Sequence, residues 1–399
     1  FLESFWRSFQ DFFFMGWSEI LTKYFWVICL IILIGLTNTG KKLKIFGTGI
    51  WYLIFSSDKK FKLPSYDPGQ IEQHLIDTKV TKELILIRHG ESTWNEVFNR
   101  GINIKFPFRL IYALCKEFIL FVTNDSCLFD APLCDIGVKQ ANLIHEYLFY
   151  NNNNYMDNNI NNNINNNDDE KDNILQKNLY IQRKKYIDIL KNKDGKYTNQ
   201  TMIVSSCLRR CIETASLALF TRLNESNETI YLLSQLQEMT RNVDGLSISN
   251  EKEIPALSWT MRSLENIVTK SSKNNMDWEN WLWNRLELSN KNGYKSDKKR
   301  GDERMKAFFS FIFNHDYDDK KYIIVSGHSL YFKNLFRGYL PKLSNCQGKT
   351  CKISNGGIVS IKLSKLILKD GKIRYRIDND SVLTIYKGFD PPKNKKKLF

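Results

Sequence analysis

Leu84-Ile85-Leu86-Ile87-Arg88-His89-Gly90 is the stretch that decides the fold of this chain of 399 residues. Its first four residues are all apolar, and this predicts a strand that is buried on both faces. Residues 202–204 (Met-Ile-Val) and 322–325 (Tyr-Ile-Ile-Val) predict two further strands of the same kind. Three such strands are expected in the middle of a sheet that helices cover on both sides.

Helical patterns lie between and beside these strands, at residues 137–150, 208–219 and 303–313. The repeated order of strand and helix is typical of the α/β class, and it predicts a three-layer α/β/α sandwich around a mainly parallel sheet. In such sheets, ligands bind at the carboxyl ends of the strands. The residues that directly follow the three strands are therefore the first candidates for a functional site.

Basic residues follow all three strands. Arg88 and His89 come directly after the first strand, and Gly90 then permits a close turn. Arg210 lies at the start of the helix that follows the second strand, where helix N-termini favour anions. His328 stands at the turn that follows the third strand. A guanidinium beside an imidazole makes an anion pocket with a nucleophile in it, so the three strand ends predict one anion site.

These motifs resemble the histidine phosphatase superfamily, in the branch that includes the cofactor-dependent phosphoglycerate mutases. The similarity runs from about residue 83 to about residue 363. It includes Asp130-Ala-Pro-Leu-Cys-Asp-Ile-Gly-Val-Lys-Gln-Ala141, which is similar to the family's Leu-Thr-x-x-Gly-x-x-Gln-Ala helix start. The resemblance implies a phosphoglycerate mutase-like fold and an enzyme that forms a phosphohistidine, with neither a metal ion nor a cofactor.

The resemblance also implies roles for single residues. His89 matches the catalytic nucleophile, and Glu238 in Leu-Gln-Glu-Met matches the catalytic general acid and base. The expected phosphate-binding residues are Arg88, Asn95, Arg210 and His328. A nucleophilic imidazole has to be neutral, whereas His328 would add a further donor to the phosphate as a cation. Glu238 needs a raised pKa in order to protonate the leaving oxygen.

Neighbouring residues offer alternatives for two of these roles. Glu91 and Asp244 compete with Glu238 for the role of the acid, since that assignment depends on spacing. Arg209 directly precedes Arg210 and is expected to face another side of the helix. Arg210 is therefore the preferred phosphate ligand of the two.

The sequence favours hydrolysis over transfer between two sites of a substrate. After the expected acid it reads Glu238-Met-Thr-Arg-Asn-Val-Asp-Gly, where the glycolytic mutases carry an Arg-His-Tyr-Gly-type string. A long insertion between Trp94 and Asp130 replaces the short substrate loop of the mutases. We therefore predict a phosphomonoester hydrolase, with a mutase-type phosphoryl transferase as the alternative. A membrane-tethered, non-catalytic scaffold is a further alternative, against which the intact basic residues count.

Composition limits the partners. The net charge of +15 suits an anionic partner, such as a phosphorylated small molecule or phosphoprotein, or an anionic membrane. No recognisable nucleic-acid module accompanies the charge, so a nucleic acid is not expected. Lysine-rich loops that only keep the surface soluble are the alternative. The eight cysteines form no CxxC pair, which argues against zinc and for reduced thiols in a cytosol-facing domain.

The N-terminal region is apolar. Residues 24–36 form an uncharged run between Lys23 and Lys41, which is short against the roughly 20 residues that a membrane span needs. Residues 45–55 form a second apolar stretch with two aromatic residues that favour membrane interfaces. We predict membrane attachment through residues 24–55, with the rest of the chain on the cytosolic side. A cleaved signal peptide and a buried core helix are the alternatives.

The chain divides into four predicted parts: a hydrophobic membrane-anchor region (1–60), a linker (61–81), a histidine phosphatase domain (82–390) and a basic tail (391–399). Two insertions are expected in the domain, at about 98–129 and 150–200. The second contains 12 Asn among residues 151–167, and we expect a disordered loop up to about residue 200. Residues 106–122 are helical and apolar on more than one side, which favours core packing over a second membrane contact.

Overall fold

The computed structural model describes residues 38–150, 170–256, 277–293 and 298–391, together with residues 24, 25, 27, 29, 32, 33, 258 and 295. Its centre is one sheet of eight strands. The strands are β1 (Ile76–Arg88), β2 (Thr201–Ser206), β3 (Ile230–Leu233), β4 (Leu286–Glu287), β5 (Tyr322–Gly327), β6 (Ile358–Leu368), β7 (Ile373–Ile377) and β8 (Leu383–Tyr386).

The sheet is mixed. Its order is β4-β3-β2-β5-β1-β6-β7, and β8 pairs with β6. The five strands from β4 to β1 are parallel to one another, whereas β6 pairs antiparallel with β1, β7 and β8. The predicted α/β class and the mainly parallel sheet are therefore confirmed. The three predicted strands are β1, β2 and β5, which lie side by side in the middle of the sheet.

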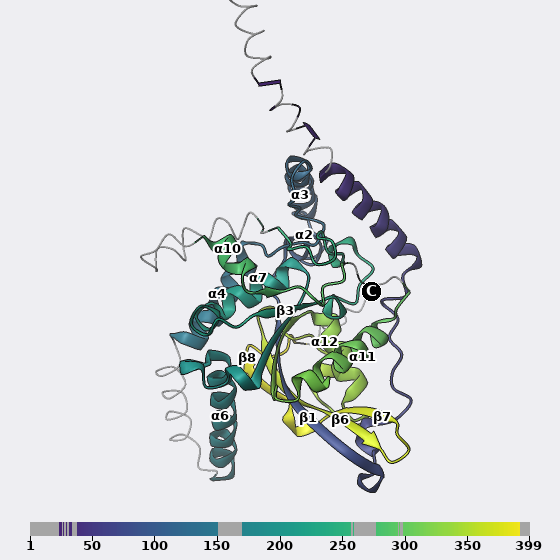
Figure 1. Cartoon of the computed structure of the whole chain (residues 1–399), viewed down its shortest axis with the longest axis vertical. Coiled ribbons are helices and arrows are strands. Elements are labelled where there is room, and N and C mark those ends of the chain that lie inside the picture. Colours follow the sequence, from purple (N-terminus) through teal and green to yellow (C-terminus); the bar gives the residue numbers. More distant parts are fainter. Residues whose placement is uncertain are drawn as a thin grey trace, which may run out of the picture.

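Alternate residues of the central strands enter two separate cores. In β1, Ile85 and Ile87 pack into one core, and Leu84 and Leu86 pack into the other. Figure 1 shows α4 and α6 on one side of the sheet and α11 and α12 on the other. The helices of the first side are α4 (Asp135–Phe149), α6 (Glu170–Lys191), α7 (Arg209–Ala218), α8 (Phe220–Ser226) and α10 (Trp278–Trp283), and those of the second are α11 (Gly301–Ile312) and α12 (Ser329–Tyr339). The three predicted helices are α4, α7 and α11.

Two helices connect β1 to α4 beyond the carboxyl ends of the strands, α2 (Thr93–Phe98) and α3 (Phe106–Leu120). Only Ala113 and Glu117 of α3 are buried, so the prediction that residues 106–122 pack into the core is wrong. The Glu117 carboxylate accepts hydrogen bonds from the backbone of Cys127 (2.8 Å) and from the Ser126 hydroxyl (2.8 Å). The buried Glu117 carboxylate therefore ties α3 to the following loop. Most apolar side chains of α3 face outward.

The prediction of a disordered loop at 150–200 is wrong for residues 170–200. Residues 170–200 form α6 and two short 3₁₀ helices, while residues 151–169 lie outside the described residues. Ile187 and Leu190 of α6 enter the core, and the Tyr186 hydroxyl donates a 2.7 Å hydrogen bond to Glu83. The polar composition of this segment predicts disorder, but a few apolar residues at the right positions are enough to attach the helix to the core.

At the N-terminal end, residues 38–55 form a helix, which we call the N-terminal helix. Its buried positions include Asn38, Lys42, Ile45 and Tyr52, which form a stripe along one side. Within the described part of the chain, no helix is long and apolar enough to cross a membrane. Most of the predicted span at 24–36 lies outside the described residues, so the N-terminal anchor has no support from the structure.

The segment after the N-terminal helix enters the core through Asp58. This carboxylate is fully buried and accepts hydrogen bonds from Arg304 Nε (2.8 Å), Lys295 Nζ (2.7 Å) and the Thr240 backbone N–H (3.1 Å). Lys295 also donates to the Glu238 carbonyl at 2.5 Å. The buried charges are thus paired, and they connect the beginning of the described chain with the segment around Glu238.

A close backbone contact joins the end of β1 to α4. A Cβ atom on Gly137 would lie 2.0 Å from the Glu91 carbonyl oxygen, and one on Gly90 would lie 2.4 Å from the Gly137 carbonyl oxygen. The Gly90 N–H donates to Thr214 Oγ1 of α7 at 3.1 Å. Two glycines therefore let α4 and α7 close around the turn that carries His89.

Substitution of Gly137 tests this contact. Gly137→Ala is expected to lower the free energy of unfolding by about 1–3 kcal/mol, because the added methyl group meets backbone rather than a movable side chain. Gly47→Ala is the matched control: nothing lies within 4 Å of the added atom, and the residue is in a helix. There we expect a gain of about 0.5–1 kcal/mol. Equal effects in denaturant titrations would contradict the argument.

Candidate active site

The register of the sheet brings the three predicted strand ends together. Arg88 is opposite Gly327 in the β1–β5 pair, and Ser205 is opposite Ser326 in the β2–β5 pair. A cavity of about 140 Å³ lies at this edge of the sheet. It is lined by Arg88, His89, Trp94, Asn95, Asn99, Arg210, Glu238, Thr240, Asn242, Asp244, Ser329, Leu330 and Lys352. Five of the six predicted site residues are in this set, and His328 is not.

His89 is buried at the end of β1, and its ring is held in one orientation. Its Nδ1 lies 2.6 Å from the carbonyl oxygen of Gly90. A carbonyl oxygen can only accept, so Nδ1 carries the proton and Nε2 keeps its lone pair. Burial lowers the pKa of His89 well below its usual value, and the charges of Arg210 and Arg88 lower it further. The ring is therefore neutral, as a nucleophile requires.

His328 lies behind His89 rather than in the cavity wall. It is fully buried, and the two ring centroids are 5.1 Å apart with an edge-on packing. His328 Nε2 lies 2.8 Å from Ser206 Oγ and 3.4 Å from Cys211 Sγ. Burial lowers its pKa well below the usual value, and Arg210 and His89 add to this effect. The expectation of a cationic His328 is thus corrected, because burial beside Arg210 favours the neutral ring.

The two predicted arginines flank the cavity and are oriented by different partners. Arg210 Nη1 donates to the Asp244 carbonyl at 2.8 Å, and its Nη2 lies 3.5 Å from Asp244 Oδ2. Arg88 Nη1 donates to the Ile353 carbonyl at 2.5 Å and to Asp390 Oδ2 at 3.2 Å. Within the described residues, no hydrogen-bond partner is found for Arg88 Nε. Both guanidiniums are almost completely buried, which strengthens their attraction for an anion.

Arg209 has a structural place, as its position beside Arg210 predicts. Its guanidinium forms an ion pair with Asp125, and its Nε donates to the Asp130 carbonyl at 3.0 Å. Its backbone N–H donates to Asp130 Oδ1 at 2.9 Å. Arg209 therefore fastens the loop between α3 and α4 to the start of α7, on the other side from the cavity.

Two carboxylates line the cavity. Glu238 Oε1 accepts hydrogen bonds from the backbone of Met239 (2.9 Å) and Tyr331 (3.1 Å), and its Oε2 accepts one from Leu330 (3.2 Å). These contacts hold it at the first turn of α12. Asp244 pairs with Arg210, and burial raises its pKa, as does the charge of Glu238, while Arg210 lowers it.

The third predicted candidate for the acid lies elsewhere. Glu91 Oε1 accepts a hydrogen bond from Arg100 Nε at 2.9 Å, and Glu91 does not line the cavity. The structure therefore leaves Glu238 and Asp244 as the two carboxylates within reach of a bound phosphate group.

Several residues that line the cavity were not predicted. Trp94 and Asn99 are two of them, and they lie in α2 and directly after it, beside the predicted Asn95. Lys352 enters from the loop before β6, and Asp390 orients Arg88 from the C-terminal end of the described chain. None of these follows a parallel strand, so the strand-end rule gives no signal for them.

The described residues offer no metal site. Across residues 38–150, 170–256, 277–293 and 298–391, no group of three or more His, Cys, Asp or Glu side chains could hold a metal ion. The positive charge at the cavity comes from Arg88, Arg210 and Lys352. The arrangement can therefore bind a phosphate group and present a neutral imidazole to it.

A comparison with solved structures finds distant neighbours, whereas no protein-family model and no curated protein matches the chain. A mycobacterial glucosyl-3-phosphoglycerate phosphatase is 12% identical over 75% of this chain and 98% of its own, with a TM-score of 0.30. A phosphoglycerate mutase from Bacillus anthracis is 14% identical (77% and 95% covered, TM-score 0.32). An ecdysone phosphate phosphatase from Bombyx mori is 13% identical (78% and 95% covered, TM-score 0.34).

These neighbours belong to the histidine phosphatase superfamily, which is also the family that the sequence motifs resemble. Their TM-scores lie between 0.30 and 0.34. The roles of the residues are therefore argued from the site itself.

The two buried histidines predict a loss of stability in mild acid. Folded His89 and His328 stay neutral as the pH falls below about 6.5, whereas both take up protons in the unfolded chain. The unfolded state then binds more protons. The free energy of unfolding should therefore fall below about pH 6.5, by up to about 1.4 kcal/mol per pH unit for each histidine.

Chemical denaturation at about pH 7 and about pH 5 measures this slope. In His89→Gln the slope should be shallower by the contribution of one histidine, since carboxylates contribute equally to both proteins. Identical slopes for the two proteins would show that His89 titrates alike in the folded and unfolded states.

Proposed function

We propose that the chain is a phosphomonoester hydrolase that forms a covalent phosphohistidine at His89, with Glu238 as general acid and base. The observation that carries the proposal is the 2.6 Å contact between His89 Nδ1 and the Gly90 carbonyl. It supports a neutral ring with an available Nε2, and that ring lies beside the guanidiniums of Arg88 and Arg210. A nucleophile and fixed cations around one phosphate group are the parts that phosphoryl transfer needs.

In the first half of the reaction, the Nε2 lone pair attacks phosphorus and the bond from phosphorus to the ester oxygen breaks. Arg88 and Arg210 bind the non-bridging oxygens, whose charge they neutralise without moving. Protonated Glu238 gives its proton to the leaving oxygen, which departs as an alcohol. The Gly90 carbonyl keeps the Nδ1 proton in place and stabilises the positive charge that the phosphorylated ring acquires.

In the second half, a water molecule attacks the phosphohistidine. Ionised Glu238 takes a proton from this water, the bond from nitrogen to phosphorus breaks, and inorganic phosphate leaves. His89 returns to its neutral form with the same Nδ1 proton. His328 is a positioning residue here, because it packs against His89 from behind and lies outside the cavity wall.

The proposal includes the partners of the chain and its place in the cell. The substrate is a phosphorylated small molecule or phosphoprotein, and Asn95 adds a contact to its phosphate. Residues 24–55 attach the chain to a membrane, and the catalytic domain faces the cytosol. The net charge of +15 and the uncharged run at 24–36 support this arrangement.

Removal of the nucleophile tests the mechanism. His89→Ala should lower the hydrolysis of an aryl phosphate by at least about a thousandfold, because the covalent route is lost. His145→Ala is the matched control: His145 is also a partly buried histidine, but it contacts Thr221 at 2.8 Å and does not line the cavity. The wild-type chain, quenched during turnover with a ³²P-labelled substrate, should carry an acid-labile and base-stable label. A label that persists in His89→Ala would disprove the assignment.

The choice between the two carboxylates is testable by the leaving group. Glu238→Gln should slow an alkyl phosphate by about 10²–10⁴-fold and a nitrophenyl phosphate much less, because only the alkyl leaving group needs a proton. Asp244→Asn should affect both substrates alike, through the orientation of Arg210. The opposite pattern would assign the proton transfer to Asp244.

A further inference from the structure

The N-terminal helix and α3 expose an unusual number of apolar side chains. We call this surface the two-helix face; its residues are Leu43, Phe46, Ile50, Trp51, Leu53, Ile54 and Phe55 of the N-terminal helix, and Ile102, Ile104, Phe108, Ile111, Tyr112, Leu114, Phe118, Ile119 and Val122 in and around α3. Phe118 is 82% exposed, Ile119 is 74% exposed and Phe108 is 72% exposed. Many exposed apolar side chains on neighbouring helices are typical of an interaction site.

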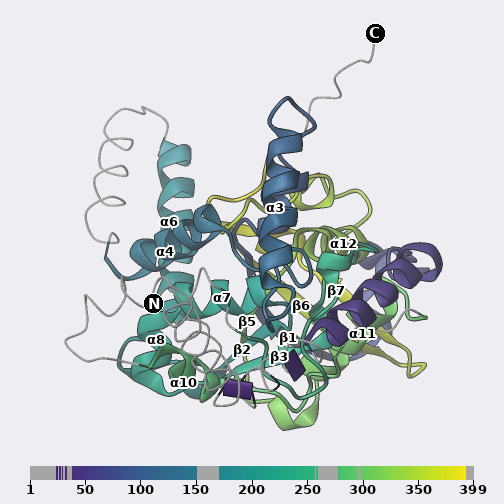
Figure 2. The ribbon, with the colours of Figure 1, turned by 90° about the horizontal axis from the view of Figure 1, so that it is seen from above.

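Two hydrogen bonds hold the two helices next to one another. Lys42 Nζ donates to the Leu120 carbonyl at 2.5 Å, and Asn38 Nδ2 donates to the Val122 carbonyl at 3.0 Å. Figure 1 shows the start of the N-terminal helix beside the end of α3, and Figure 2 shows the same pair from above. Residues that are 78 and 84 positions apart in sequence thus lie next to one another.

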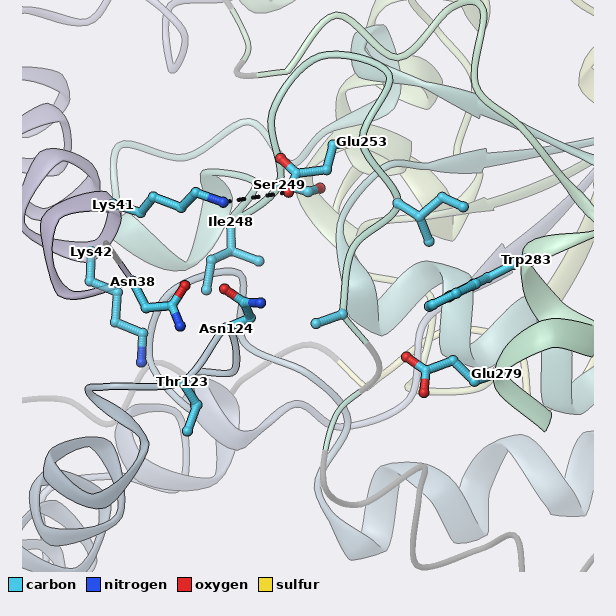
Figure 3. A pocket seen from close by; sticks show the side chains of 12 residues that line it. Asn38, Lys41, Lys42, Thr123, Asn124, Ile248, Ser249, Glu253, Glu279 and Trp283 are labelled. Atoms are coloured by element: carbon cyan, nitrogen blue, oxygen red, sulfur yellow. Dashed lines mark ion pairs between the residues drawn. The ribbon is translucent and has the colours of Figure 1, made fainter. Parts of the chain in front are cut away.

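The N-terminal helix is attached through both polar and apolar side chains: Asn38 and Lys42 are buried near its start, and Ile45 and Tyr52 are buried further along. Figure 3 shows Lys41 directed toward Glu253, with 3.6 Å between Nζ and Oε1, and Lys42 and Asn38 directed toward the loop of Thr123 and Asn124. A surface helix of a water-soluble protein usually buries most of its large apolar side chains. This helix buries Ile45 and Tyr52 but leaves seven large apolar side chains exposed.

The charges of the two-helix face have one sign. The N-terminal helix contains no acidic residue, and the only acid of α3, Glu117, is buried. The basic side chains on the two helices and the loop before α3 include Lys44, Lys105, Arg109 and Lys116. Lys41 and Arg100 are also exposed but pair with Glu253 and Glu91, and Lys42 is buried. Apolar and aromatic side chains mixed with cations, and an absence of exposed acids, are the composition that binds anionic lipid.

The surrounding sequence fits the same partner. The uncharged run at 24–36 leads directly into the N-terminal helix. The residues described there are helical, and Tyr24, Phe25, Val27, Ile32 and Leu33 among them are exposed. An apolar segment that precedes the two-helix face along the chain brings this side of the molecule, rather than another, to a lipid surface.

We infer that the two-helix face lies in the head-group region of an anionic bilayer, so that α3 is a second membrane contact besides residues 24–55. The apolar side chains of α3 enter the interface, and the basic side chains meet lipid phosphates. This contact lies parallel to the bilayer and does not span it.

The two-helix face and the catalytic cavity lie at the same end of the sheet. Trp94 lines the cavity and packs on Phe98 of the same helix, with ring centroids 4.2 Å apart, and Phe98 packs on Phe106 of α3 at 6.3 Å. The N-terminal helix rests on the loop of Asp244, because a Cβ atom on Gly49 would lie 2.3 Å from Val243 Cγ1. Lipid binding therefore brings the cavity close to the bilayer.

The test uses the full chain and vesicles of phosphatidylcholine with or without phosphatidylserine. Phe118→Trp places a fluorophore on the two-helix face, and Leu343→Trp is the matched control at an apolar residue that is 89% exposed on the loop after α12. With brominated acyl chains in the vesicles, the added emission should be quenched in Phe118→Trp and unchanged in Leu343→Trp. The chain has nine tryptophans of its own, so the emission that counts is the difference between Phe118→Trp and the wild type. If bromine leaves this difference unchanged, the inference is overturned, even if the chain binds vesicles through residues 24–36.

A second pair of variants measures the contribution to affinity. Ile111→Glu/Phe118→Glu should bind phosphatidylserine vesicles at least about tenfold more weakly, because two apolar side chains become anionic. Leu343→Glu should bind like the wild type, and all variants should hydrolyse a soluble aryl phosphate at the wild-type rate. If the double variant instead converts a dimer into a monomer and binds lipid as before, the two-helix face is a contact between copies of the chain and the inference fails.

Discussion

A single hydrogen bond, from His89 Nδ1 to the Gly90 carbonyl at 2.6 Å, determines what the catalytic cavity can do. It fixes the tautomer, and burial between two guanidiniums keeps the ring neutral. The bond in turn depends on the turn of Gly90, which fits only because Gly137 of α4 has no side chain. The sheet places this turn next to the ends of β2 and β5, and α7 brings Arg210 to the same point. The chemistry thus follows from the close packing of three backbone segments.

Much of this arrangement could be predicted from the sequence, because buried parallel strands are uninterrupted apolar runs and their ends meet at one edge. Residues 84–87, 202–204 and 322–325 carry that signal, so Arg88, His89 and Arg210 could be placed together. The protonation of His328 could not be predicted, since it depends on complete burial beside Arg210. Lys352, Asp390 and Asp244 enter from loops or from the antiparallel part of the sheet, where no simple rule relates position in sequence to position in space.

Two helices show the limits of composition as a guide. The segment of α6 is polar enough to be taken for a disordered loop, yet Ile187, Leu190 and a few other residues anchor it to the core. In contrast, α3 is apolar enough to be taken for a core helix, yet most of its surface faces outward. In both cases the neighbours of the helix decide the outcome: α6 packs against the core beside the sheet, whereas the buried Glu117 carboxylate ties α3 to the loop that follows it.

The buried Asp58 has a consequence for where the catalytic unit begins. It neutralises Lys295 and Arg304, which also bind the Glu238 and Gln237 carbonyls. A fragment that starts after residue 58 would leave two buried cations without a counter-charge, next to the segment that carries the acid. The shortest fragment that keeps the candidate site intact therefore has to include Asp58, which the sequence places in the predicted anchor region (1–60). Proteolysis between the N-terminal helix and Asp58 would separate the two without this penalty.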